Sequence, residues 1–452
     1  MAPSIIVAVK GVDNIMKQRT VFLKTITVSV IALVLSLLFI CDGTKDHIDP
    51  ILTDEVHETG ISKVYIDGSN LNNLNKKSRA HASIRITNSD EGTSESAMYL
   101  SLQGAASIAY PKKNYSLRFD FKGSPDYYLK SNYTDSTFSR GIATADIWKD
   151  MVFSRNNSEI SSCKTGGALT GEPVLLYINN KYKGIYSITE GKSQSVFVGD
   201  REPMAVIFCE QDLEQDAYSK GIDLYSPNSA WKVIYCNPSF SSNLENSISR
   251  VFNTVYSADD SDLIDGLSEC LDMEAAIDYI IFLYFFQADD NYTKNIIWVT
   301  YDGIKWIPTA YDFDSTYGLT WDGTELLPSS YALPGIEYDG DVYGGPCIIW
   351  RRILCNDYDE ISSRYNYLRQ DILDSEKILD RFYANYSKIP ASALDEELNI
   401  WPNSPSRYVT DIDQIEDFLS VRGELLDIYF NLPVGTSEAY SIWHSAIANV
   451  KP

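Results

Sequence analysis

Alternating hydrophobic and polar positions mark the first half of the chain as strand-rich. In residues 113–121, Tyr, Leu and Phe occupy one phase and mostly polar side chains the other, which is the period of a strand with one buried face. Residues 174–178 and 181–188 read as two more strands, and the dipeptide Asn179-Asn180 between them favours a two-residue hairpin turn. The pattern therefore predicts a β-rich N-terminal part.

The second half follows a helical period. Residues 271–287 contain an apolar run that is too short to cross a bilayer, so it predicts a buried core helix. Amphipathic helices are predicted around residues 349–355, 360–386 and 411–430. The expected fold class is α+β, with a β-rich lobe over residues 61–205 and a mainly helical lobe over residues 206–452. The cleft between two such lobes is the expected site.

The N-terminal residues 1–41 read as a signal peptide or a membrane anchor. Residues 25–41 carry no charge, basic residues precede them and acidic residues follow, which places the rest of the chain outside the cytoplasm. Lipid attachment at Cys41 is a less favoured alternative, because bulky Ile40 precedes it. A polar linker over residues 42–60 follows. We expect an exported protein, secreted or at the cell surface, that contacts the membrane only through this segment.

Charge and composition narrow the chemistry. The chain has 62 acidic and 38 basic residues, a formal net charge of −24, which disfavours nucleic acid as a partner. None of the four histidines lies between residues 82 and 443, so acid–base chemistry there falls to carboxylates. The seven cysteines form no C-x-x-C pair; disulfides and free thiols both stay open.

The segment 288–318 carries the strongest chemical signal. Asp302-Gly303 predicts a tight hairpin turn that sets residue 301 opposite 304, and hence 293 opposite 312. Four carboxylates and one amide then meet at the open end of the hairpin: Asp289, Asp290, Asn295, Asp312 and Asp314. Carboxylates this close repel one another unless a cation neutralises them, and oxygen ligands suit Mg²⁺ or Mn²⁺. The sequence predicts a divalent metal site.

The order of these parts is that of a protein kinase. A core helix, an Asp followed five residues later by Asn, a hairpin and an Asp-bearing loop carry the catalytic base and the metal ligands in such enzymes. Asp290 is the predicted catalytic residue, and Asn295, Asp312 and Asp314 are the predicted metal ligands. The expected fold is therefore a two-lobed, protein-kinase-like one.

A kinase also needs a cation on the nucleotide phosphates. Lys113 is the predicted residue, because it occupies the apolar phase of its strand whereas Lys112 does not. An inward lysine needs a partner, and Glu190, at the end of a predicted hairpin strand, is the predicted one.

Five segments in order resemble blocks of the CotH kinases, the family named for spore-coat protein H. They are residues 110–120 (YPKKNYSLRFD), 129–140 (LKSNYTDSTFSR), 173–190 (PVLLYINNKYKGIYSITE), 290–295 (DNYTKN) and 312–318 (DFDSTYG). The resemblance implies an atypical, exported kinase that uses ATP with Mg²⁺ or Mn²⁺ to phosphorylate serine, or threonine, of a protein substrate. It also implies that Asp290 is catalytic, that Asn295, Asp312 and Asp314 bind metal, and that Lys113 contacts the nucleotide with Glu190 as its partner.

Two segments depart from the family pattern. LQGAAS at residues 102–107 replaces an arginine- and serine-containing stretch, and residues 308–311 (PTAY) replace a Pro-Trp pair. Two alternatives therefore stay open. One is a catalytically inactive surface or structural binding protein on a kinase-like scaffold. The other is a metal-dependent nucleotide-sugar transferase, which would require a Rossmann-like alternation of strands and helices. Because the net charge is negative, a kinase of this kind is expected to prefer protein substrates with basic residues near the serine acceptor.

Overall fold

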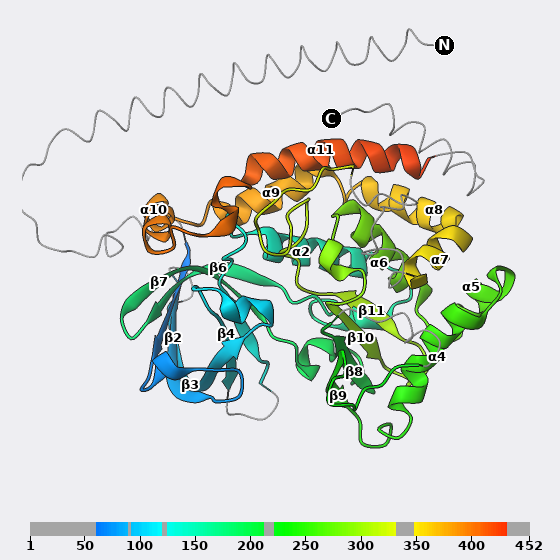
Figure 1. Cartoon of the computed structure of the whole chain (residues 1–452), viewed down its shortest axis with the longest axis horizontal. Coiled ribbons are helices and arrows are strands. Elements are labelled where there is room, and N and C mark those ends of the chain that lie inside the picture. Colours follow the sequence, from blue (N-terminus) through cyan, green and yellow to red (C-terminus); the bar gives the residue numbers. More distant parts are fainter. Residues whose placement is uncertain (1–59, 89–91, 120–123, 212–220, 331–347, 432–452) are drawn as a thin grey trace, which may run out of the picture. The chain divides into compact units, whose positions relative to one another are not determined.

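The computed structural model describes five stretches of the chain (Figure 1): residues 60–88, 92–119, 124–211, 221–330 and 348–431. The predicted signal or anchor and nearly all of the predicted linker lie outside these residues. No helix within the described stretches is long and apolar enough to cross a membrane. None of the five cysteines in them forms a disulfide.

The first seven strands close into a barrel in the order β1-β2-β3-β4-β5-β7-β6. Neighbouring strands are antiparallel except β1 and β6, which pair in parallel and complete the barrel. The strands are β1 (Ser62–Asp67), β2 (Ala80–Asn88), β3 (Gly92–Gln103), β4 (Asn114–Phe119), β5 (Tyr127–Lys130), β6 (Gly171–Ile178) and β7 (Lys181–Glu190).

The alternation of apolar and polar residues along the strands places the apolar side chains inside the barrel, as predicted. In β4, Leu117 is fully buried in the barrel core while its neighbour Arg118 is exposed. The turn between β6 and β7 is confirmed, with Asn179 and Asn180 at φ 48° and 58°. Asparagine tolerates this left-handed region better than most residues, and a two-residue hairpin requires it.

A second, antiparallel sheet has the order β11-β10-β8-β9. Its strands are β8 (Ala205–Cys209), β9 (Trp231–Cys236), β10 (Ile296–Thr300) and β11 (Ile307–Ala310). The predicted hairpin forms between β10 and β11, but its predicted register is wrong by one residue, because Val299 lies opposite Ile307. Asp302 Oδ1 accepts hydrogen bonds from the backbone amides of Ile304 and Lys305 at 2.7 and 2.8 Å. This side-chain cap widens the turn beyond two residues.

Nine α-helices are described. They are α2 (Arg140–Phe153), α4 (Leu244–Ser257), α5 (Asp260–Ser268), α6 (Met273–Phe285), α7 (Ile348–Asn356), α8 (Tyr358–Arg369), α9 (Ser375–Tyr386), α10 (Ala391–Ile400) and α11 (Ile412–Tyr429). Short 3₁₀ turns are η3 (Leu71–Asn73), η4 (Ala106–Ala109), η5 (Glu159–Ser162), η6 (Gln194–Phe197), η7 (Asp289–Asn291) and η8 (Pro405–Tyr408). The predicted buried helix is α6, in which every residue from Ala275 onward is buried.

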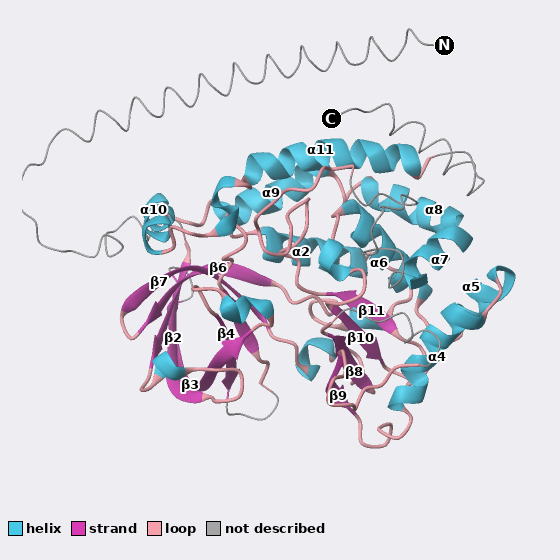
Figure 2. Ribbon diagram, in the orientation of Figure 1, coloured by secondary structure: helices cyan, strands magenta, loops and turns pink. Residues whose placement is uncertain are grey.

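The mixed α+β class is confirmed, but strands and helices are not divided between the two halves of the chain as predicted. Figure 2 shows the strands in two separate groups, and the second sheet lies within the part predicted to be mainly helical. Helix α2, from the part predicted to be β-rich, contributes to the hydrophobic core of the helices and the second sheet. All described residues belong to one compact unit.

A buried ion pair joins the barrel to α10. Lys112 Nζ lies 2.6 Å from Glu397 Oε1 and donates to the Ile185 carbonyl at 2.6 Å, while Glu397 Oε2 accepts from the Ile185 amide at 2.8 Å. Gly184 makes this approach feasible, because a Cβ there would lie 2.3 Å from Glu397 Oε2. The pair therefore fixes one side of the barrel to the C-terminal helices.

Candidate functional site

A cleft of about 640 Å³ opens between the barrel and the second sheet. This volume is in the range of small-ligand sites. Its basic lining residues are Lys76, Arg79, Arg118, Lys130, Lys192, Lys232 and Lys294, and its acidic ones are Glu210, Asp290, Asp312 and Asp314. Seven cations face four carboxylates, so the local charge is opposite in sign to the −24 of the whole chain.

Asp290 lies in η7, shortly after the buried helix α6 ends. Asn295 Nδ2 donates to Asp290 Oδ2 at 2.8 Å, and Lys294 Nζ lies 2.9 Å from the other carboxylate oxygen. Asn291 Nδ2 donates to the Tyr311 carbonyl at 2.7 Å, which ties this turn to the end of β11. The predicted catalytic Asp and the predicted metal-site Asn are thus adjacent and joined by a hydrogen bond.

Asp312 and Asp314 follow β11 on the same cleft, and their titration differs. Asp312 Oδ1 lies 2.8 Å from Lys130 Nζ. Burial alone would raise the pKa of Asp312, but the charges of Lys130 and Lys192 hold it below its usual value. Burial raises the pKa of Asp314 to about 8, and the negative charges of Asp312 and Asp290 add to this effect. Asp314 is therefore a carboxylate without sufficient positive charge nearby.

The predicted gathering of four carboxylates around one ion is wrong. Within the described stretches, no three His, Cys, Asp or Glu side chains are grouped so that they alone hold a metal ion. Mg²⁺ is usually bound by one or two protein carboxylates together with phosphate oxygens and water. Asp312, Asp314 and the amide of Asn295 fit that smaller requirement, and a divalent cation would supply the charge that Asp314 lacks.

The predicted Lys113–Glu190 ion pair is also wrong. Lys113 Nζ donates to the Ile108 carbonyl at 2.6 Å, and Glu190 Oε2 accepts from Thr170 Oγ1 at 3.0 Å. Neither residue lines the cleft. The buried lysine is Lys112, because β4 begins at Asn114 and the strand alternation does not extend back to residues 112 and 113.

None of the five lysines that line the cleft was predicted from the sequence, and two of them, Lys130 and Lys192, lie near the Tyr311 ring. Lys130 pairs with Asp312, and its ammonium lies 5.1 Å from the centroid of the Tyr311 ring. Lys130 is the second residue of the 129–140 segment, and Lys192 follows the 173–190 segment by two residues. Their place in or just after these motifs was the available signal, but the sequence does not show that both ammonium groups lie near the Tyr311 ring.

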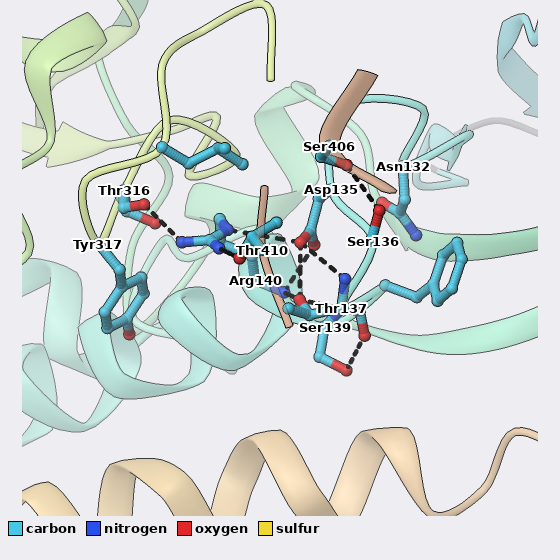
Figure 3. A network of polar contacts seen from close by, with 12 residues as sticks. Asn132, Asp135, Ser136, Thr137, Ser139, Arg140, Thr316, Tyr317, Ser406 and Thr410 are labelled. Carbon is cyan, nitrogen blue, oxygen red and sulfur yellow. Dashed lines mark hydrogen bonds and ion pairs between the residues drawn. The ribbon is translucent and has the colours of Figure 1, made fainter. Parts of the chain in front are cut away.

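A buried polar network around Arg140 and Asp135 contacts the loop that carries Asp312 and Asp314 (Figure 3). Arg140, the first residue of α2, donates to the Thr316 carbonyl at 2.5 Å and to Thr410 Oγ1 at 2.7 Å. Asp135 accepts from the Arg140 amide at 3.0 Å and lies 3.4 Å from its guanidinium. Both side chains are buried, so a fully bonded charge pair fixes the backbone just beyond Asp314.

A comparison with protein families now bears on this geometry. A family model described as CotH kinase protein matches residues 100–426, well over half of the chain. The chain belongs to this family. Its matched region includes Asp290, Asn295, Asp312 and Asp314, and the resemblance predicted from the motifs is confirmed. No curated protein matches the sequence.

The two departures from the CotH pattern both lie at the cleft. Residues 102–107, where the arginine of the pattern is missing, form one wall of it, and Gly104 takes φ 116° there. Tyr311, the last residue of the altered segment 308–311, lies under Lys130 and Lys192. This CotH family member therefore differs from the pattern at residues that a ligand in the cleft would meet.

Proposed function

We propose that the protein is an atypical protein kinase that transfers the γ-phosphate of ATP to a serine or threonine hydroxyl, with Mg²⁺ or Mn²⁺. The observation that supports this most strongly is the cleft, where Asp290 and Asn295 lie beside Asp312 and Asp314 and basic side chains line the other walls. In this proposal the barrel is the N-terminal lobe of a kinase-like fold, and the second sheet with its helices is the C-terminal lobe.

Each residue then has a distinct role. Asp290 orients the acceptor hydroxyl and accepts its proton, while Asn295 holds the Asp290 carboxylate in place through its amide. Asp312, Asp314 and Asn295 would hold the metal, which supplies charge neutralisation on the phosphates. Lys130 positions Asp312 and adds positive charge beside it. The Arg140 network keeps the loop of Asp312 and Asp314 in register with Asp290.

The alternatives receive less support. A nucleotide-sugar transferase would require a Rossmann-like parallel sheet, whereas the second sheet is antiparallel and a barrel precedes it. An inactive scaffold predicts that the protein does not respond to ATP with Mg²⁺. We also infer from the N-terminal segment that the kinase domain acts outside the cytoplasm.

The direct test is transfer of labelled γ-phosphate from ATP to serine peptides by the full chain. Two peptides of equal length, one with basic and one with acidic flanks, are each paired with an alanine version that lacks the acceptor. We expect Mg²⁺- or Mn²⁺-dependent labelling of serine, faster for the basic peptide if the net charge steers association.

Asp290→Asn should lower kcat by at least about 10²-fold, because the base acts on the acceptor. Asp359→Asn, an exposed carboxylate of α8, is the matched control and should transfer at the wild-type rate. Equal transfer by Asp290→Asn and wild type would overturn the catalytic assignment.

A further inference from the structure

Lys192 is a basic residue of the cleft to which the proposed function gives no role. It follows β7, and its backbone amide donates to Tyr128 Oη at 3.1 Å, which fixes the start of its side chain. Its ammonium lies 3.5 Å from the centroid of the Phe208 ring and 4.1 Å from that of Tyr311. The side chain is half-buried and lines the cleft on the side of Asp312.

The basic residues of the cleft differ in how their charges are balanced. Five have a carboxylate within 4.0 Å: Lys76 and Lys232 share Glu210, Arg118 has Asp126, Lys130 has Asp312 and Lys294 has Asp290. In the described part of the chain, Arg79 and Lys192 have none. Arg79 is exposed, so water solvates its charge, whereas Lys192 is half-buried in the cleft.

The surroundings of Lys192 do not neutralise it. Two aromatic faces attract an ammonium only weakly, and Lys130 is a like charge close by. Burial, together with Lys130 and despite the opposing charge of Asp312, lowers the pKa of Lys192 well below its usual value. Such a group gains from an anion that enters the cleft, because the anion supplies the missing counter-charge where water is scarce.

We propose that Lys192 binds a phosphate group of the polyphosphate chain of the nucleotide, in the cleft that Asp312 and Asp314 also line. The ligand class is a polyphosphate, free or as part of a nucleoside triphosphate, and its identity as the phosphate donor rests on the proposed kinase function. Lys192 thus takes the place that the sequence assigned to Lys113. The position suits this role, because Lys192 lines the same cleft as Asp312 and Asp314, the carboxylates that would hold the metal.

A purely structural role for Lys192, as a cation packed on two rings, makes different predictions. The test is calorimetric titration of the full chain with inorganic tripolyphosphate and with ATP, each with Mg²⁺. Lys192→Met keeps an unbranched apolar side chain against the rings and removes only the charge. Lys181→Met, an exposed lysine at the other end of β7, is the matched control.

We expect Lys192→Met to weaken both probes by about tenfold to a hundredfold, the range for a charge-assisted contact. Lys192→Arg should recover part of the affinity, and Lys181→Met should bind as the wild type does. The ligand-free melting temperature of Lys192→Met should be no lower than that of the wild type, since an unbalanced charge has been removed.

Wild-type affinity of Lys192→Met for both probes would overturn the proposal. A loss of affinity accompanied by a lower ligand-free melting temperature and no recovery in Lys192→Arg would also overturn it.

The same measurements distinguish failure of the Lys192 site from failure of the proposed kinase function. Lys192-dependent tripolyphosphate binding without transfer from ATP would support the site and contradict the kinase. Transfer that depends on Asp290 but is unaffected in Lys192→Met would contradict the site alone. No binding of either probe to wild type would overturn both.

Discussion

A buried lysine, Lys112, and a half-buried one, Lys192, show two ways in which the protein treats a charge that is partly or wholly removed from water. Lys112 is 1% exposed, and its ammonium is matched by Glu397 and the Ile185 carbonyl. Lys192 lies against two rings and has no carboxylate within 4.0 Å in the described part of the chain. Burial is the main cause of a lowered pKa for both. A charge that is balanced internally holds the fold together, whereas one that is left unbalanced at a cleft is available to a ligand.

Removing the partner of the balanced lysine should have the largest effect on stability. Glu397→Ala leaves Lys112 buried without its counter-charge, which should lower the free energy of unfolding by about 3–5 kcal/mol. Urea denaturation monitored by tryptophan fluorescence measures this change. Asp395→Ala, an exposed residue of the same helix, is the control and should change stability by less than about 0.5 kcal/mol. Equal stability of the two variants would remove the distinction between the lysines.

A second balanced cation, Arg140, extends the comparison to the loop of Asp314. Arg140→Lys keeps the charge but loses the forked contacts with the Thr316 carbonyl and Thr410. We expect a loss of about 1.5–3 kcal/mol in unfolding free energy, the range for hydrogen bonds to a charged group. Phosphate transfer should fall in kcat more than in KM for ATP, because the loop is displaced relative to Asp290. A variant with wild-type stability and kcat would show that the network does not position the loop.

Asp314 carries a negative charge that too few nearby cations balance, so its effect on stability should depend on pH. Its folded-state pKa of about 8 is above the unfolded value, so the folded protein holds a proton that the unfolded chain releases. Stability without metal should therefore fall steadily as the pH rises from about 4, near the unfolded pKa, to about 8, the folded one. Asp314→Asn should lack this fall and be the more stable form at pH 8.

The measurement is the melting temperature in EDTA from pH 5 to 8.5. A stability difference between Asp314→Asn and wild type that stays constant over this range would contradict the assignment of the raised pKa to Asp314.

Of the substitutions considered, Lys113→Met should change stability and ATP affinity least. Lys113→Met removes one hydrogen bond to the Ile108 carbonyl, worth about 1 kcal/mol or less. Its affinity for ATP with Mg²⁺ should stay within about twofold of wild type, because Lys113 does not line the cleft. A loss as large as that expected for Lys192→Met would restore the role that the sequence assigned to Lys113.

The sequence predicted those parts of the molecule that depend on local pattern. The β6–β7 turn follows from Asn179-Asn180, helix α6 follows from its apolar run, and the spacing of Asp290 and Asn295 placed them beside each other correctly. These features need only the preferences of neighbouring residues and the periods of helix and strand.

The predictions from the sequence were wrong where the structure depends on side-chain contacts or on contacts between residues far apart in the chain. The hairpin register shifted because the Asp302 carboxylate caps its turn, which a two-residue turn rule does not anticipate. Lys112 was misjudged because its partner Glu397 lies 285 residues away in the sequence. Lys192 was missed for the same reason, since its neighbours Phe208 and Tyr311 come from the second sheet and the loop after β11.

The central claim is that this cleft is a metal–nucleotide site, and one calorimetric titration tests it most directly. ATP is titrated into the full chain with and without Mg²⁺, for wild type and for the double variant Asp312→Asn/Asp314→Asn. We expect one ATP per chain bound in a Mg²⁺-dependent manner, and an affinity at least about tenfold lower in the double variant. No binding to wild type, or Mg²⁺-independent binding that the double variant retains, would contradict the account.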